Sequence, residues 1–183
     1  SDWYVPQVAT RVATPQATTS AAAITWPRRC QRSRHSMRAS IVLTNAPVAM
    51  RMGEINKLAE AINAPIIGAD ATKDEDLEKL FSEGREKLGG QVDFVLHSIG
   101  MSPNVRKGKG YDDLNYEWYK QTLDISAMSL HRMIQAAYKQ DAMAEWGSVV
   151  ALSYIAAQRV FPGYGDMADA KALLESIARS WGY

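Results

Sequence analysis

The sequence predicts an α/β protein built on a doubly wound parallel sheet, and three observations lead to that prediction. From residue 39 onward, short apolar runs alternate with longer segments whose apolar residues recur at helical spacing. The short runs are almost continuously apolar, which is typical of strands buried on both faces of a parallel sheet. The chain has 183 residues, 46% of them hydrophobic, which is enough for one packed core.

The first half of this regular region contains two strand–helix pairs. Residues 41–44 are apolar and mostly β-branched, so a buried strand is expected there. The helical apolar spacing of 48–62 predicts an amphipathic helix, and 65–70 follow as the second strand. The segment 72–88 has three acids near its start and a lysine near its end, an arrangement that favours a helix through its dipole.

The second half repeats the alternation with longer elements. Residues 93–99 form the next apolar run and predict a strand, and 101–114 are rich in Gly, Pro, Asn and Lys and predict a loop. A long helix is expected over 115–144, followed by a buried strand at 148–153. The last helix is expected to begin near Asp166 and to run to the end of the chain.

The first 38 residues differ from the rest in charge and composition. Residues 1–40 contain six arginines, no lysine and one acid, whereas the remaining chain has more acids than bases, so we place a boundary near residue 39. Segment 1–38 shows no sustained period and is rich in Ala, Thr, Ser and Pro. It is open to interpretation as a transit peptide, as a basic tail, or as a disordered or artefactual replacement of a native start, which is the interpretation we favour.

Composition also excludes several classes of protein and site. Cys30 is the only cysteine, which excludes an internal disulfide and a Cys-based zinc site and favours a reducing compartment. We expect no metal site. The net charge of +1 gives no indication of a nucleic-acid partner. No apolar run approaches the roughly 18–20 residues that span a bilayer, so no membrane segment is expected.

One pair of residues near the last helix has a spacing that suits chemistry. Tyr164 precedes Lys171 by seven residues, and seven steps of about 100° return to nearly the same helix face. A nearby ammonium would lower the pKa of the tyrosine hydroxyl, which is ordinarily near 10. Because Tyr and Lys are both common, spacing alone favours a buried tyrosine followed by a solvated lysine. A second pair, Tyr116 and Lys120, has the spacing Tyr-x-x-x-Lys but follows a loop, so we expect that tyrosine to pack on its neighbours.

The residues around Tyr164 carry a family resemblance. Ser153-Tyr154 closes a predicted strand, Tyr164 follows Tyr154 by ten residues, and Lys171 completes a Tyr-x6-Lys pattern, while the run 97–100 closes an earlier strand. Together these motifs resemble the enoyl-acyl carrier protein reductases of the short-chain dehydrogenase/reductase superfamily, in a form similar to those of Bacteroidetes. The resemblance spans residues 39–183 and implies a partial dinucleotide-binding reductase domain with a Rossmann-like sheet, incomplete at both ends.

The resemblance also implies individual site residues. Tyr154, Tyr164 and Lys171 would be catalytic, and Ser102 would lie on the substrate side together with both tyrosines. The cofactor-binding positions would be Asn45, Asp70, Ala71, Ser98, Ile99, Gly100 and Lys171. Within this set Asp70 and Ala71 fall where the family holds the adenine ring, although an Asp after a strand is equally an N-cap for the next helix.

The reaction that the resemblance implies is reduction of a trans-2-enoyl thioester of acyl carrier protein in fatty acid biosynthesis. NADH would give a hydride to the β-carbon, and Tyr164 would stabilise the charge that develops on the thioester oxygen, by the logic of an oxyanion hole. Lys171 would hold the nicotinamide ribose. The family resemblance further implies a cytoplasmic homotetramer.

Two expected parts of such an enzyme are missing from the sequence. A dinucleotide-binding sheet needs a glycine-rich turn after its first strand, and no glycine precedes Gly53. The family's later strands and mobile substrate loop would follow Tyr183. We therefore expect this chain alone to bind NADH poorly or not at all and to lack measurable reductase activity. The alternatives are another short-chain reductase that acts on a ketone or aldehyde, and a non-catalytic oligomerising fragment.

Overall fold

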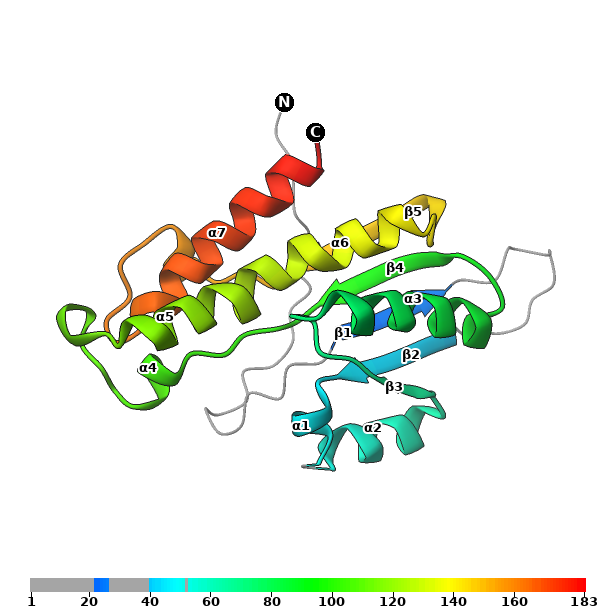
Figure 1. Ribbon diagram of the computed structural model, residues 1–183, viewed down its shortest axis with the longest axis horizontal. Helices are drawn as coiled ribbons and strands as arrows, with labels where there is room; N and C mark the ends of the chain where they lie inside the picture. The colour runs from blue at the N-terminus through cyan, green and yellow to red at the C-terminus, as the bar shows by residue number, and fades with distance from the viewer. Residues whose placement is uncertain (1–21, 27–39, 52) are drawn as a thin grey trace.

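The computed structural model describes residues 22–26, 40–51 and 53–183, whose strands form one five-stranded sheet in the order β3-β2-β1-β4-β5 (Figure 1). The strands are β1 (Ala22–Trp26), β2 (Ser40–Asn45), β3 (Ile66–Gly68), β4 (Val92–His97) and β5 (Met143–Ala151). The α-helices are α1 (Pro47–Met50), α2 (Glu54–Ile62), α3 (Asp74–Leu88), α4 (Pro103–Arg106), α5 (Tyr116–Leu123), α6 (Ser129–Lys139) and α7 (Gly165–Trp181). Shorter turns are η1 (Tyr111–Asp113), η2 (Asp124–Met128) and η3 (Ile155–Ala157).

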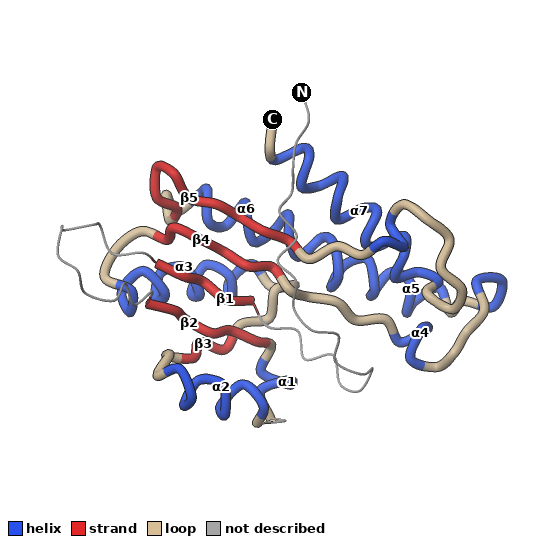
Figure 2. The backbone as a smooth tube through the Cα atoms, turned by 180° about the vertical axis from the view of Figure 1, so that it is seen from behind, coloured by secondary structure: helices blue, strands red, loops and turns tan. Residues whose placement is uncertain are grey.

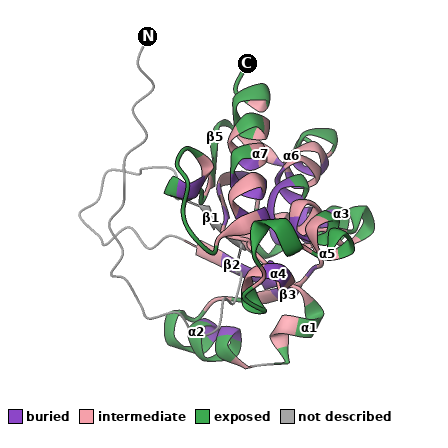
Figure 3. Ribbon diagram, turned by 90° about the vertical axis from the view of Figure 1, so that its left-hand side faces the viewer, coloured by how far each residue is buried: buried purple, intermediate pink, exposed green. Residues whose placement is uncertain are grey.

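Alternate residues of the strands bury themselves on opposite faces of the sheet. Val42 and Ile67 join the main core with side chains of α3, α6 and α7, whereas Leu43 packs in a second cluster against α2. Figure 2 shows α3 and α6 behind the strands, and Figure 3 shows buried residues gathered between the sheet and helices α6 and α7. Helices α3, α6 and α7 therefore cover one face of the sheet, whereas α2 covers the other face at β2 and β3. Residues 145–150 of β5 are exposed, so the expectation of a buried strand at 148–153 is wrong.

The strand β1 departs from the expected all-parallel sheet. The pairs β2–β3 and β4–β5 are parallel, but β1 runs antiparallel to both β2 and β4. The α/β class is therefore confirmed and the wholly parallel direction is wrong at this strand. Residues Ala22–Trp26 supply the backbone partners that β2 and β4 need at the centre of the sheet. The remaining calls on segment 1–38 fall at residues 1–21 and 27–38, outside the described part.

The reversal of β1 has a consequence for ligand binding. The order β3-β2-β1-β4-β5 is that of a dinucleotide-binding sheet, in which the first strand ends in a phosphate-binding turn at the carboxyl edge. Here Trp26, the carboxyl end of β1, pairs with Ser40 at the amino end of β2. The carboxyl end of β1 consequently lies beside the amino ends of β2 and β4, opposite to the carboxyl ends of those strands.

Two predicted helices have different limits in the structure, and local backbone geometry explains both. The expected helix 48–62 divides into α1 and α2 because Gly53 adopts φ 75°, a left-handed conformation that interrupts a helix. The expected helix 115–144 ends at Lys139, and Asp141 at φ 49° turns the chain into β5, which begins five residues earlier than predicted. Between α5 and α6 the chain passes through η2, a single π-helical segment.

Candidate functional site

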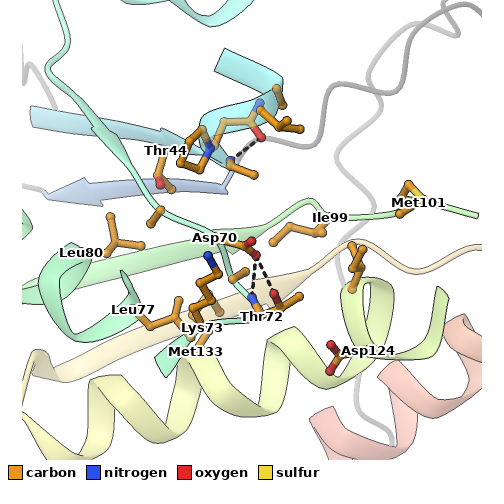
Figure 4. Close-up of a pocket in the computed structure, with 18 of the residues that line it drawn as sticks. Thr44, Asp70, Thr72, Lys73, Leu77, Leu80, Ile99, Met101, Asp124 and Met133 are labelled. Atoms are coloured by element: carbon orange, nitrogen blue, oxygen red, sulfur yellow. Dashed lines mark hydrogen bonds between the residues drawn. The ribbon is translucent and has the colours of Figure 1, made fainter. Parts of the chain in front are cut away.

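A cleft of about 760 Å³ opens at the carboxyl ends of β2, β3 and β4 (Figure 4). We call it the strand-end cleft. Its walls include four of the predicted cofactor-binding residues: Asn45, Asp70, Ala71 and Ile99. Residues from α3, from η2 and from the segment after β4 complete the lining. Its place matches the rule that open α/β sheets bind ligands beyond the carboxyl ends of their strands, and its volume suits a small molecule or cofactor.

Asp70 shapes one wall of the cleft through a local turn. Its Oδ1 accepts hydrogen bonds from the Thr72 backbone N–H at 3.0 Å and from the Thr72 hydroxyl at 2.7 Å. The Asp70 backbone N–H in turn donates to Asp76 Oδ2 at 2.8 Å. Lys73, rather than Asp70, holds the N-cap position of α3, so the alternative assignment of Asp70 as the helix cap is wrong.

Two polar side chains at the end of β2 are buried in the cleft wall. Thr44 is 3% exposed and Asn45 is 6% exposed, and among the described residues neither Thr44 Oγ1 nor Asn45 Nδ2 has a hydrogen-bond partner. The other amide atom, Asn45 Oδ1, accepts from the Ala46 backbone N–H at 2.9 Å. Buried polar atoms are nearly always paired, so two orphans at one strand end indicate a place where a ligand supplies the missing bonds.

Lys171 lies at the next part of the same edge, between the ends of β4 and β5. Its side chain is 8% exposed, and Nζ donates to Leu152 O at 2.8 Å and to Ile99 O at 3.2 Å. Burial lowers the pKa of the ammonium to about 8. Gly100 adjoins it, since a β-carbon there would lie 3.7 Å from Met167 Cε and 3.8 Å from Lys171 Nζ. The catalytic lysine predicted from sequence is thus brought to the exit of β4.

Tyr154 and Tyr164 pack against each other beside the first turn of α7, with their ring planes tilted by 34°. Their ring centroids lie 4.7 Å apart, and Phe161 packs edge-on against Tyr154 at 5.5 Å and against Tyr164 at 5.8 Å. Burial first, and then Tyr154, raise the pKa of Tyr164. The expectation that Lys171 lowers this pKa is wrong, because the ammonium is held on two backbone carbonyls rather than at the hydroxyl.

Ser102 is placed differently from the other predicted residues. It is 3% exposed, its hydroxyl donates to Asp166 Oδ1 at 2.6 Å, and the same oxygen accepts from the Val105 backbone N–H at 3.0 Å as the N-cap of α4. It does not line the strand-end cleft. Ser98 is half-buried directly after β4 and is likewise absent from the cleft lining.

A buried carboxylate, which sequence reasoning missed, and a buried histidine lie near the site. Asp166 is fully buried, although an acid at a helix start suggests only a favourable dipole contact. His97 at the end of β4 bonds Ser129 Oγ at 2.8 Å. Because the Ser129 hydroxyl donates to Ile125 O, His97 Nε2 is the donor of that pair, and burial lowers the pKa of His97 to about 4.

The pair Tyr116 and Lys120 behaves as expected for a surface contact. Tyr116 is 71% exposed, stacks on Tyr119 with ring centroids 6.3 Å apart, and has Lys120 Nζ 5.4 Å from its ring centre. Across the described residues, no cluster of three or more His, Cys, Asp or Glu side chains has the arrangement of a metal site. None of the helices described is both long enough and apolar enough to cross a bilayer.

Comparison with known proteins gives the family. A family model described as enoyl-(acyl carrier protein) reductase matches residues 28–183. The chain belongs to the enoyl-acyl carrier protein reductase family. It is 37% identical over 127 residues to the NADH enoyl-acyl carrier protein reductase FabI of Rickettsia bellii, covering 68% of this chain and 47% of that protein. A Rhizobium meliloti enoyl-acyl carrier protein reductase is 33% identical over 142 residues, with coverage of 77% and 51%.

Solved structures of family members share the fold. FabI from Alistipes finegoldii is 64% identical, with a TM-score of 0.75 over 78% of this chain and 54% of that one. Its complex with NADH matches equally well over 50% of that chain. The chain spans about half the length of the curated relatives it matches. The family match and these structures confirm the α/β fold class inferred from sequence.

Proposed function

We propose that the strand-end cleft and the Tyr164–Lys171 region together form the site of an NADH-dependent enoyl-acyl carrier protein reductase. The observation that carries this proposal is the meeting of sequence-distant residues at one sheet edge. Ile99 lines the cleft, and its carbonyl oxygen also accepts the hydrogen bond from Lys171 Nζ. A ligand that extends from the cleft past Ile99 therefore reaches the buried lysine.

The residues at the cleft fit the adenosine part of the cofactor. Thr44 Oγ1 and Asn45 Nδ2 offer buried hydrogen-bonding atoms that lack partners within the described part of the chain. Asp70 and Ala71 would line the adenine end, and Ser98, Ile99 and Gly100 would face the cofactor after β4. When bound, NADH supplies the hydride that reduces the β-carbon of the enoyl thioester. The solved complex of Alistipes FabI with NADH supports this choice of cofactor.

The side chains of α7 and the preceding loop would handle the substrate. In the proposed role, the Tyr164 hydroxyl donates to the thioester oxygen as negative charge builds there, and Lys171 donates to ribose hydroxyls. The raised pKa of Tyr164 keeps its hydroxyl protonated and able to donate at neutral pH. Tyr154 would pack beside the acyl chain, and Ser102 would contribute on the substrate side through the segment that it caps.

A chimera provides the test. Residues 40–183 of this chain would replace the matching part of the Alistipes reductase, which supplies the parts of the reductase that this chain does not cover. We expect NADH-dependent reduction of a crotonyl thioester, followed as loss of absorbance by NADH. Tyr164→Phe should lower kcat by about 100-fold or more, the usual cost of removing one donor to a developing oxyanion.

The control variant is Tyr116→Phe. It changes the tyrosine of the Tyr-x-x-x-Lys pair on the surface and should leave kcat unchanged. A folded chimera that binds NADH yet reduces no enoyl thioester would refute the proposal, as would activity that survives Tyr164→Phe. Faster reduction of simple ketones than of the crotonyl thioester would favour the ketone-reductase alternative.

For the complete protein, a cytoplasmic homotetramer remains the proposed assembly. Tyr138 of α6 is 78% exposed beside Trp181 of α7, with ring centroids 6.4 Å apart, and exposed aromatic pairs of this kind are frequent at protein interfaces. Light scattering on the chimera would give its mass. A monomer at all concentrations would contradict the proposed assembly, and Tyr138→Asp should dissociate a tetramer that uses this surface.

A further inference from the structure

Asp166 carries a buried negative charge in the first turn of α7, outside the strand-end cleft. Its Oδ1 accepts from Ser102 Oγ at 2.6 Å, and its Oδ2 accepts from Asn104 Nδ2 and Thr122 Oγ1, both at 2.8 Å. All four residues are at most 3% exposed. We call these four residues the Asp166 network. A carboxylate so far from water is stable only because charge-assisted hydrogen bonds replace its hydration.

The donors of the Asp166 network are themselves fixed by backbone contacts. Ser102 caps α4. Asn104 Nδ2 donates to Asn115 O at 3.1 Å, and Asn104 Oδ1 accepts from the Asn115 backbone N–H at 2.9 Å. Thr122 Oγ1 also lies 2.8 Å from Trp118 O, the second acceptor within reach of its single hydroxyl hydrogen. The network therefore joins α4, the start of α5 and the start of α7 into one unit.

The same unit includes the backbone that faces the proposed cofactor. The segment leaving β4 is tied to α7 at two points, since Ile99 O accepts from Lys171 Nζ and Ser102 Oγ donates to Asp166. Between these ties, the Met101 backbone N–H donates to Ser126 Oγ of η2 at 2.9 Å. Asp166 follows Tyr164 by two residues and precedes Lys171 by five, so it anchors the first turn of α7 between the two.

We propose that Asp166 is a positioning residue of this site. It fastens the segment 99–102 to the first turn of α7 and so sets where Lys171 and Tyr164 lie, without itself touching substrate or cofactor. The inference rests on the proposed function of Lys171 and Tyr164.

Lys171 provides a readout that separates positioning from simpler roles. Burial holds the pKa of Lys171 down at about 8. If removal of a nearby carboxylate acted through electrostatics alone, it would lower the pKa of the ammonium further. Loosening the segment around Lys171 would admit water and raise the pKa toward 10.5. His97, which also faces Lys171, has its pKa lowered to about 4 and stays neutral throughout such a titration.

The experiment titrates the whole 183-residue chain, carrying 13C-labelled lysine, by NMR from neutral to alkaline pH. Lys171→Arg assigns the signal. In Asp166→Asn, the side-chain NH2 replaces an accepting oxygen and faces a donor of the network, so a hydrogen bond is lost. We expect the pKa of Lys171 to rise by about one pH unit, a tenfold change in the acid dissociation constant. Thr122→Val removes one network bond at nearly constant volume and should give a smaller rise, which keeps the test intact if Asp166→Asn does not fold.

The matched control is Asp169→Asn. Asp169 lies one turn further along α7, and its Oδ2 accepts from the hydroxyls of Tyr111 at 3.0 Å and Tyr119 at 2.7 Å nearer the surface. We expect this variant to leave the pKa of Lys171 unchanged.

Three results would overturn the inference: no change of the Lys171 pKa in Asp166→Asn and Thr122→Val, a decrease in either variant, or an equal rise in Asp169→Asn. The titration uses neither NADH nor thioester. Its failure is therefore distinct from failure of the chimera to reduce a crotonyl thioester.

Discussion

The strand-end cleft and the Asp166 network differ in how their buried polar groups are hydrogen-bonded. In the cleft, Thr44 Oγ1 and Asn45 Nδ2 are buried without partners. In the network, a fully buried carboxylate receives a donor from each of three side chains. An unpaired buried group costs free energy, whereas a satisfied network fixes geometry. The difference indicates that the cleft is shaped for a ligand that completes it, and that the α7 region is organised before any ligand arrives.

Lys171 is connected to both regions, because it donates to the carbonyl of Ile99 in the cleft wall and lies on α7 with Asp166. Its titration gives the largest expected effect on stability. Burial lowers its pKa from 10.5 to about 8. Below about 8 the ammonium is charged in both states and the folded chain bears the cost of burying it. Between about 8 and 10.5 the unfolded chain keeps its proton while the folded chain has lost it, so this group makes stability rise with pH.

Lys171→Met removes that dependence because the side chain is never charged. As pH rises through this window, the free energy of unfolding of the original chain should increase by about 3 kcal/mol relative to that of the Met variant. Urea unfolding of both proteins at a series of pH values measures the difference. The comparison variant Lys171→Arg stays charged. The free energy of unfolding of the original chain should therefore increase by a similar amount relative to that of the Arg variant over the same window. A difference between the original chain and the Met variant that is flat with pH would show that the lysine is not buried as described.

The sequence allowed the alternation of strands and helices to be predicted, because apolar runs and helical spacing reflect burial directly. It also allowed Tyr154, Tyr164 and Lys171 to be singled out, through spacing and through motifs that surround them. The direction of β1 was beyond reach, since a five-residue run without a period pairs equally well in either direction.

Other features depend on contacts between distant segments. Asp166 is an unremarkable acid in sequence, and only the folded chain brings Ser102 and Thr122, far from it along the chain, to its oxygens. The pKa of Tyr164 was predicted in the wrong direction because helix spacing placed Lys171 on the same side, while two backbone carbonyls hold its ammonium elsewhere. Gly53 and Asp141 show that single left-handed residues set element boundaries that periodicity does not reveal.

One substitution made at two places tests the contrast between the two regions with the smallest change in structure. Thr44 and Thr122 are both buried threonines, and valine has nearly the same shape. Thr44→Val removes a hydroxyl that has no partner, so we expect the free energy of unfolding to increase by about 1 kcal/mol. Thr122→Val removes a donor to Asp166 and should decrease it by about 1–2 kcal/mol.

The two variants should also separate in ligand binding when they are placed in the chimera. Thr44→Val should weaken NADH binding several-fold while it stabilises the free protein, because a group that costs stability in the empty cleft is used by the ligand. Thr122→Val touches no part of the cleft and should change NADH affinity less. Denaturant unfolding and NADH fluorescence titration give the two quantities. If both substitutions destabilise the protein equally, the hydroxyl of Thr44 has a partner, and the contrast between an incomplete cleft and a complete network is lost.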